Sequence, residues 1–265
     1  MSVGAAVATN APEIVAQRRG TTLEVTLDRP GKMNAFSASL VDALLAAVSA
    51  AYGDGTRLLV LRGNGRNFSA GFDMAGVDRQ SEGDLLLRFV RIEQLLQAVH
   101  HAPFETLVLA HGRNFGAGVD LVGACSRRIA TPDATFRMPG LKFGLALGTH
   151  RFALQVGGDV ARDILAESKT FGAEEGRRIG FLTGIAEKGE WPKVIERMVA
   201  AAEALPPDSH ARLVAATRAD TRDADLAELV RSAAAPGIRQ RIAAYLAESA
   251  GNAATPGAAG AVSKE

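Results

Sequence analysis

Two glycine-containing loops hold the residues of this sequence whose types and spacing are best suited to chemistry. Arg66–Met74 (RNFSAGFDM) follows the apolar run Leu58–Leu61, and Gly112–Gly118 (GRNFGAG) follows the apolar run Thr106–Ala110. In parallel sheets, ligands bind at the loops that follow the carboxyl ends of strands. Small residues allow backbone NH groups to approach a ligand closely, so the two loops are expected to converge on one oxygen atom.

A helix that begins near Gly116 would add the positive end of its dipole to such a site. The spacing alone also fits a simpler interpretation, in which Gly116, Ala117 and Gly118 only permit close packing of a helix. Both interpretations stay open at this point. Neither loop has the glycine and lysine spacing of a Walker or dinucleotide fingerprint, so those phosphate-binding sites are not expected.

Metal, nucleic-acid and membrane functions find little support in the composition. The five histidines include no pair at the i, i+4 spacing of helical metal ligands, so no metal site is expected. The 30 basic and 29 acidic side chains leave a formal net charge of +1, which offers no overall field for nucleic acid or an anionic membrane. No segment is apolar over the length that a bilayer span requires. Any anionic ligand must therefore be bound locally.

The elements that position the two loops follow from hydrophobic periodicity. Leu23–Leu27 alternates like a strand, Ser37 is placed to cap a helix with apolar residues at helical spacing, and Leu58–Leu61 is typical of a buried strand. Two strands joined by a helix form a βαβ unit with parallel pairing. The pattern then continues with a helix near residues 85–99, the strand Thr106–Ala110, a helix near Gly116 and a strand at Arg128–Ala130.

After about Gly148 the strand signals fade and helical stretches follow, which predicts a βα core over residues 13–181 and a C-terminal helical region over residues 182–248. These stretches centre on Arg151–Val156, Val160–Ala166, Trp191–Ala204, Ala211–Ala216 and Leu226–Leu246. Residues 1–12 and 249–265 are expected to be flexible tails, because the latter are Ala, Gly, Ser and Asn with few large apolar groups. The single cysteine, Cys125, is expected to be a buried, inert thiol, and a cytoplasmic location is the default expectation.

Four segments together carry a more specific signal than any one glycine loop. They are Val25–Phe36 (VTLDRPGKMNAF), Leu59–Gly63 with Phe68–Met74, Gly112–Leu121 (GRNFGAGVDL), and Thr135–Gly140 (TFRMPG) with Gly144. In order and spacing they resemble the crotonase, or enoyl-CoA hydratase/isomerase, superfamily over the region from Glu13 to Phe181.

The resemblance implies an α/β crotonase fold, a spiral of ββα units (ClpP-like) with a C-terminal helical region, assembled as a homotrimer or a dimer of trimers. It implies an acyl-CoA thioester as ligand, with coenzyme A as part of the substrate and no separate cofactor. By the family pattern, the NH groups of Phe72 and Ala117 bind the thioester oxygen and stabilise an enolate, flanked by Ala70, Gly71, Met74 and Gly116. Because these donors are backbone groups, alanine at position 117 preserves the role.

Further expectations concern residues near the two loops and a segment close to the C-terminus. Lys32 and Met33 match residues that line the coenzyme A entrance, where Lys32 either meets a phosphate or stays a solvated surface residue. Asp73 is expected to support the first loop by accepting backbone NH bonds. Near the C-terminus, the arginines of Ala234–Ile242 replace the family's usual segment and are candidates for contact with coenzyme A phosphates.

The sequence departs from the family where hydratases carry two glutamates that activate one water. Asp120 and Gly140 stand at those positions, and Gly148 stands where some branches carry a substitute acid. Asp120 keeps a carboxylate and is the expected general base. His150, at a predicted helix start where the dipole favours neutral imidazole, is a second candidate base.

These features leave two hypotheses. The first is an acyl-CoA enzyme that uses Phe72, Ala117 and Asp120, for which isomerisation, decarboxylation or thioester hydrolysis fits better than classical hydration. The second is a non-catalytic acyl-CoA-binding protein of the same fold that keeps the NH pair and has lost its acid and base.

Overall fold

The computed structural model describes residues 12–254, and a six-stranded sheet forms its centre. The strand order is β1-β2-β3-β4-β6-β9; β1 pairs antiparallel with β2, and every other neighbouring pair is parallel. A smaller sheet has the order β5-β7-β8. The strands are β1 (Ile14–Arg19), β2 (Thr22–Leu27), β3 (Leu58–Gly63), β4 (Glu105–Ala110), β5 (Arg113–Phe115), β6 (Arg127–Ala130), β7 (Thr135–Arg137), β8 (Phe171–Gly172) and β9 (Gly184–Ile185).

Helices join the strands and make up the C-terminal part of the described chain. They are α1 (Ala38–Ala51), α2 (Glu82–His100), α3 (Ala117–Ala124), α4 (Thr149–Val156), α5 (Gly158–Glu167), α6 (Ala173–Arg178), α7 (Trp191–Glu203), α8 (Pro207–Thr217), α9 (Arg222–Ala234) and α10 (Ile238–Ala254). Short 3₁₀ turns occur at 30–32, 77–79, 140–143 and 188–190. The expected N-cap of α1 is confirmed, because the Ser37 hydroxyl accepts a hydrogen bond from the Leu40 NH at 3.0 Å.

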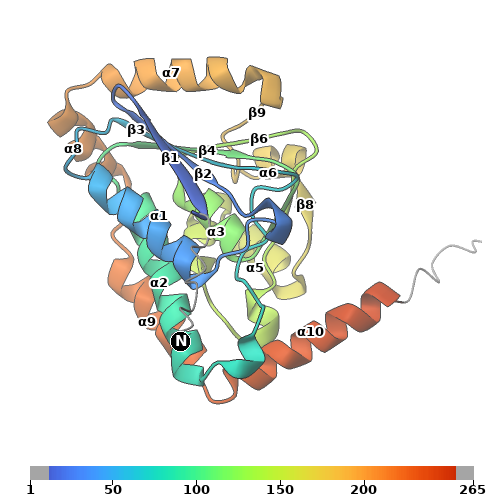
Figure 1. Cartoon of the computed structure of the whole chain (residues 1–265). Coiled ribbons are helices and arrows are strands. Elements are labelled where there is room, and N and C mark those ends of the chain that lie inside the picture. The colour runs from blue at the N-terminus through green and yellow to red at the C-terminus, as the bar shows by residue number, and fades with distance from the viewer. Residues whose placement is uncertain (1–11, 255–265) are drawn as a thin grey trace, which may run out of the picture.

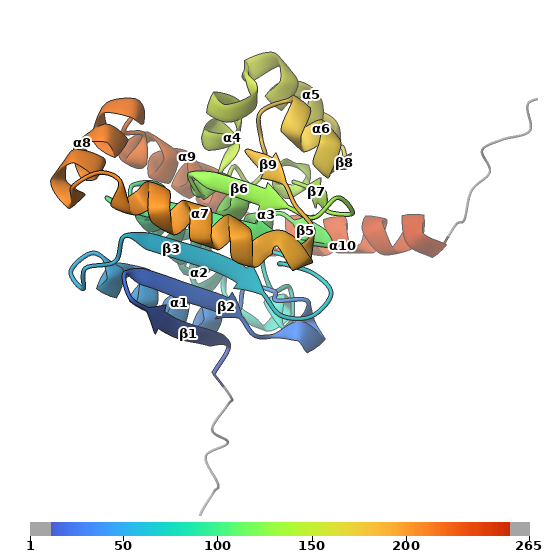
Figure 2. The ribbon, with the colours of Figure 1, turned by 90° about the horizontal axis from the view of Figure 1, so that it is seen from above.

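The central strands are apolar on both faces because helices cover both sides of the sheet. Leu58 and Val60 of β3 pack with Trp191 and Val194 of α7, while the alternate residues Leu59 and Leu61 belong to the main core on the opposite face. Figure 1 shows α7 lying along one side of the sheet and α1, α2 and α3 on the other. Figure 2, seen from above, shows β1, β2, β3, β6 and β9 following one another across the sheet.

This topology brings the two glycine-containing loops to one edge of the molecule. One loop leaves the carboxyl end of β3, and the other leaves the neighbouring parallel strand β4 and leads through β5 into α3. The loops are also joined directly, since Ser69 forms an isolated parallel bridge with Asn114. The parallel βαβ arrangement predicted from the sequence is thus confirmed.

Two expectations about the C-terminal half need correction. Strands do not end before Gly148, because the short strands β8 and β9 follow it. The helical stretch expected over Leu226–Leu246 is two helices, since the chain breaks at Pro236 and Gly237, where Gly237 has a φ of +83°.

The flexible tails were expected at residues 1–12 and 249–265. The helix α10 continues to Ala254, into the second segment. Residues 1–11 and 255–265 lie outside the described residues. Figure 1 shows the far end of α10 projecting from the body of the molecule. Among the helices of residues 12–254, none combines the length and the apolar character that a membrane span requires.

Candidate functional site

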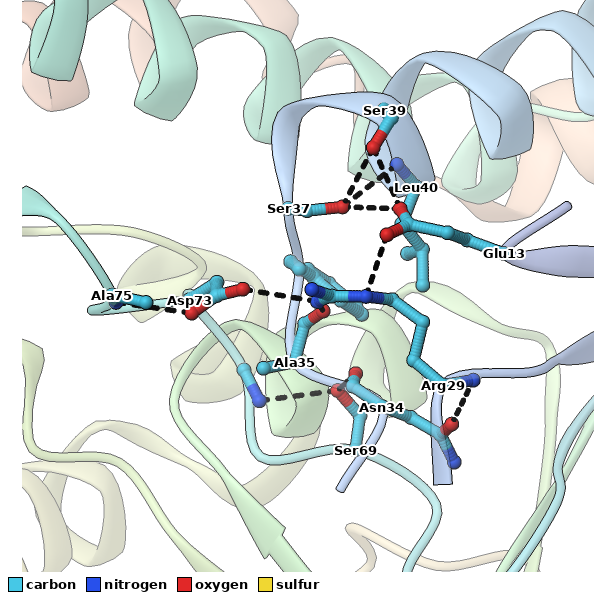
Figure 3. Close-up of polar contacts among 12 residues, drawn as sticks. Glu13, Arg29, Asn34, Ala35, Ser37, Ser39, Leu40, Ser69, Asp73 and Ala75 are labelled. Carbon is cyan, nitrogen blue, oxygen red and sulfur yellow. Dashed lines mark hydrogen bonds and ion pairs between the residues drawn. The ribbon is translucent and has the colours of Figure 1, made fainter. Parts of the chain in front are cut away.

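Hydrogen bonds from the side chain of Asn34 stabilise the loop after β3. Its Oδ1 accepts a hydrogen bond from the Arg29 NH at 2.8 Å, and its Nδ2 donates to the carbonyls of Asn64 and Asn67 at 2.9 and 3.0 Å. The Ser69 hydroxyl donates to the Asn34 carbonyl at 2.8 Å. Figure 3 shows the Asn34 side chain pointing toward the Arg29 NH and the Ser69 hydroxyl lying beside the Asn34 backbone. Asn34 therefore fixes the loop to the segment that follows β2.

An ion-pair chain fixes the far side of the same loop. Arg29 pairs with Asp73 at 3.0 Å and with Glu13 at 2.7 Å, as Figure 3 shows. The Asp73 carboxylate also accepts a hydrogen bond from the Ala75 NH at 3.0 Å. Burial alone would raise the pKa of Asp73, but the Ala75 NH, Arg29 and Arg88 outweigh it and lower that pKa. Asp73 supports the loop through these bonds, in the manner expected from the sequence.

The second loop packs against the first at two glycines. A Cβ at Gly71, where φ is +74°, would lie 2.3 Å from the Phe115 carbonyl oxygen and 3.0 Å from the Ala117 nitrogen. A Cβ at Gly118 would lie 2.8 Å from both the Cβ and the carbonyl oxygen of Ser69. Any larger residue would separate the loops. The two loops therefore pack closely against each other at Gly71 and Gly118.

The NH groups of Phe72 and Ala117 are both unpaired in the part of the chain that the structure describes. The parallel bridge between Phe36 and Phe72 uses the Phe36 NH, which donates to Gly71, and the Asp73 NH, which donates to Phe36, so the Phe72 NH is left over. Ala117 is the first residue of α3, where helix geometry leaves the NH without a carbonyl partner. Two free donors thus lie on adjoining loops.

Both residues line a cavity of about 270 Å³ whose wall is mainly apolar. The wall is built from both loops, Met33, the segment 138–147, and the helices α2, α3, α4, α5 and α10. Among the described residues that line the cavity, Asp120 is the only one with a charged side chain, and Thr149 and Tyr245 carry the other polar side-chain groups. The remaining lining residues are Met33, Ala70, Met74, Phe89, Phe115, Gly116, Met138, Pro139, Gly140, Leu141, Phe143, Leu145, Leu147, Leu165 and Leu246.

Asp120 projects from the first turn of α3 and is only 6% exposed. Its Oδ1 is buried without a hydrogen-bond partner in the described chain. Burial raises the pKa of Asp120 well above its usual value; Arg151 acts in the opposite direction and Glu93 adds to the rise. An acid with a raised pKa in an apolar cavity is a candidate for proton transfer.

The other predicted residues lie in different places. Met33 is 51% exposed and reaches the cavity, whereas Lys32 is exposed and does not line it. His150 is the second residue of α4, but its side chain is 51% exposed, its Nδ1 lies 3.0 Å from Asp225, and it does not line the cavity. The Arg241 guanidinium donates to backbone carbonyls that include Phe143 at 2.9 Å.

Two features of the site have no clear signal in the sequence. Arg88 of α2 lies 4.0 Å from the centre of the Phe72 ring and donates to the carbonyls of Phe36 and Asp73 at 3.2 and 3.0 Å, so it braces the first loop. Tyr245 of α10 packs against Phe143 and closes the cavity from the C-terminal end of the chain. The apolar spacing of these helices predicts buried faces, but not which loop each face meets.

Gly140 lies in the cavity wall with little room for a side chain. A Cβ there would be 2.9 Å from the Leu145 carbonyl oxygen, a backbone atom. The Leu145 NH in turn donates to the Gly140 carbonyl at 2.9 Å, which closes a tight loop. In residues 12–254, no group of three or more His, Cys, Asp or Glu side chains is arranged to hold a metal ion.

Comparison with known proteins agrees with this architecture. The family model for enoyl-CoA hydratase/isomerase matches residues 17–237. A crystal structure of a "putative enoyl-CoA hydratase/isomerase" from Bordetella parapertussis is 54% identical, with a TM-score of 0.89, and the match covers 89% of this chain and 99% of that one. A Bacillus halodurans enoyl-CoA hydratase, at 22% identity and a TM-score of 0.78, covers 88% of this chain and 99% of its own and shows the same fold.

Two curated relatives carry related names. A Rhodobacter capsulatus protein named "Probable enoyl-CoA hydratase" is 37% identical over 60% of this chain, and the match spans 62% of that relative's length. A Mycobacterium tuberculosis protein of the same description is 32% identical over 66% of this chain and 73% of its own. With its family match across most of its length and its crotonase-fold neighbours, the chain belongs to the enoyl-CoA hydratase/isomerase family.

Proposed function

We propose that this protein binds an acyl-CoA thioester with its carbonyl oxygen between the NH groups of Phe72 and Ala117. The observation that carries this proposal is that two unpaired backbone donors lie on adjoining loops at the wall of an apolar cavity. Removal of a proton beside a thioester places negative charge on that oxygen. Two fixed donors stabilise this charge, and each is worth about 2.7–4 kcal/mol in reactions of this kind.

The reaction that best fits the cavity is movement of a double bond along the acyl chain. The Asp120 carboxylate takes a proton from the carbon next to the thioester carbonyl, and the electron pair moves onto the thioester oxygen. The same carboxyl group then returns the proton to a more distant carbon, which shifts the double bond without adding or losing atoms. One acid suffices for these steps, and Asp120 is the one carboxylic acid that residues 12–254 contribute to the wall.

Hydration fits less well, because addition of water in the family uses two carboxylates. Gly140 has no side chain, and the Leu145 carbonyl occupies the space where one would begin. A raised pKa suits the single-acid route, since a carboxylate with higher proton affinity is a stronger base toward a carbon acid.

A second candidate function is acyl-CoA binding without turnover. The observation that favours it is the position of the Asp120 Oδ1, which is buried without a partner and lies against Gly148. In this case the cavity holds an acyl chain while Asp120 only fills space.

Incubation of the protein with a 3-enoyl-CoA and with crotonyl-CoA, measured together with thioester binding, tests these proposals. The expected result is conversion of the 3-enoyl ester to its 2-enoyl isomer at a rate far above hydration of crotonyl-CoA. Asp120→Asn should bind the ester and lose the conversion. Binding of both esters without any turnover supports the second function, and failure to bind either ester contradicts both.

A further inference from the structure

Behind the cavity wall, three helices meet in a buried ionic cluster. Arg151 of α4 donates through Nη2 to Glu93 of α2 at 2.5 Å, and through Nη1 to Glu93 at 2.9 Å and to Asp225 of α9 at 3.0 Å. The Arg151 and Glu93 side chains are only 3% and 1% exposed. The Thr221 hydroxyl donates to Asp225 at 2.7 Å, and the His150 Nδ1 lies 3.0 Å from the same carboxylate. A cluster this deeply buried fixes the guanidinium in one place.

The first turn of α4 connects this cluster to the cavity. Gly148, the residue that precedes α4, lies against the Asp120 carboxyl group, and Arg151 extends from the same turn into the cluster. Between them, Thr149 lines the cavity. Arg151 itself does not line the cavity, and within the described chain it donates no hydrogen bond to Asp120.

The charged groups that act on Asp120 are therefore Arg151 from α4 and Glu93 from α2, with opposite signs. Asp225 from α9 and His150 from α4 lie one step further away, bound to the cluster. A guanidinium free to turn toward Asp120 would form an ion pair and hold that carboxyl group in its ionised, weakly basic form. Glu93 supplies two of the three bonds that prevent this turn.

We propose that Glu93 is a positioning residue for Asp120: it holds the Arg151 guanidinium in the α2–α4–α9 cluster, away from the cavity, so that Asp120 keeps a high affinity for the proton it transfers. This role rests on the proposed function of Asp120. It also explains why the Asp120 Oδ1 has no hydrogen-bond partner in the described residues, although Arg151 acts on this acid. Burial raises the pKa of Asp120 and Glu93 contributes in the same direction.

The test is the titration of the Asp120 carboxyl carbon by ¹³C NMR, with the signal assigned by its loss in Asp120→Asn. In the unmodified protein, the midpoint should lie well above the ordinary value of about 3.9. In Glu93→Gln it should fall by about 1 pH unit or more, because a negative charge is lost and Arg151 is released. The rising limb of kcat/KM against pH should move in the same direction.

Two variants serve as controls. Glu93→Asp keeps the charge and should titrate close to the unmodified protein. Asp225→Asn also removes a carboxylate from Arg151, yet Asp225 does not act on Asp120 directly, so its shift should be smaller than that of Glu93→Gln. A comparable loss of thermal stability in Glu93→Gln and Asp225→Asn would show that both disturb the cluster to a similar extent.

Several results would overturn the role of Glu93. A titration midpoint of about 3.9 for Asp120 in the unmodified protein would contradict the role of Glu93, even if no variant folds. An unchanged midpoint in folded Glu93→Gln, or an equal shift in Asp225→Asn, does so as well. If Asp120→Asn keeps its isomerase activity, the proposed function fails instead, whatever Glu93 does to the titration.

Discussion

The carboxyl group of Asp120 lies directly against the Cα of Gly148. A Cβ at position 148 would be 2.0 Å from the Asp120 Oδ1 and 2.6 Å from its Cγ. The acid on α3 thus occupies the space into which a side chain at the start of α4 would extend. The two positions depend on each other: the absence of a side chain at 148 is what allows Asp120 to lie where it does.

We expect Gly148→Ala to displace the Asp120 carboxyl group and lower kcat by about 10²-fold, which is the size of loss that a misplacement of 1 Å can cause. Gly20→Ala is the matched control, because Gly20 has a similar φ of +60°, compared with +65° at Gly148, and no atom within 4 Å of its Cβ position. Both variants should lose about 1–2 kcal/mol of stability from left-handed strain. Equal kcat values in the two variants would contradict the importance of this contact.

Ala117→Pro removes one of the two proposed oxyanion donors without removing a side chain. Proline suits the first position of a helix, so α3 should still form. We expect kcat to fall about 10²- to 10³-fold. Gly158→Pro makes the same change at the first residue of α5, at an exposed position, and should leave kcat unchanged. Full activity in Ala117→Pro would rule out its NH as a donor.

Gly140→Glu introduces the glutamate that hydratases of the family carry at this position, but we expect its carboxylate not to reach the same place. Its Cβ must displace the Leu145 carbonyl, which should cost roughly 1–3 kcal/mol of stability. We expect no gain in hydration of crotonyl-CoA. Gly189→Glu is a suitable control for thermal denaturation, because nothing lies within 4 Å of a Cβ there. A hydratase rate that rises in Gly140→Glu at unchanged stability would refute the steric argument.

His100 should make the protein sensitive to acid. Its burial, assisted by Arg218, His101 and Arg151, lowers its pKa from 6.5 to about 3. Between these two pH values His100 is protonated in the unfolded chain and neutral in the folded chain. Its contribution to the free energy of unfolding is therefore fully present above pH 6.5 and decreases as the pH falls toward 3. The loss is on the order of 3–5 kcal/mol.

The pH dependence of the unfolding free energy, measured in urea, checks this expectation. His100→Gln should flatten the slope between pH 6.5 and 3, while His150→Gln, whose side chain is half-exposed, should leave most of it. Identical slopes in His100→Gln and the unmodified protein would show that other groups cause the acid loss.

The Cys125 thiol should be unreactive toward thiol reagents in the folded protein. It is buried, and burial raises the pKa of its thiol to about 12, so almost no thiolate is present at neutral pH. Ellman's reagent should react only as fast as the chain unfolds, and completely in denaturant. Because the chain has one cysteine, rapid labelling of the native protein would directly contradict its burial.

Features that depend on local pattern could be predicted from the amino-acid sequence. The apolar runs of β3 and β4, the Ser37 cap and the glycine loops were readable because side-chain periodicity and backbone freedom are properties of short segments. The family resemblance added the prediction that the NH groups of Phe72 and Ala117 are donors, since backbone donors depend on loop conformation and not on side-chain identity.

Tertiary structure alone decided which side chains face the cavity. His150 stands at a helix start, as the sequence indicated, yet its ring meets Asp225 from α9, a residue 75 positions away in the chain. Asp120 meets Gly148, and Arg151 meets Glu93, through the packing of α2, α3 and α4. Such contacts depend on how separate helices lie against one another, and the periodicity of one helix carries no information about its partner's side chains.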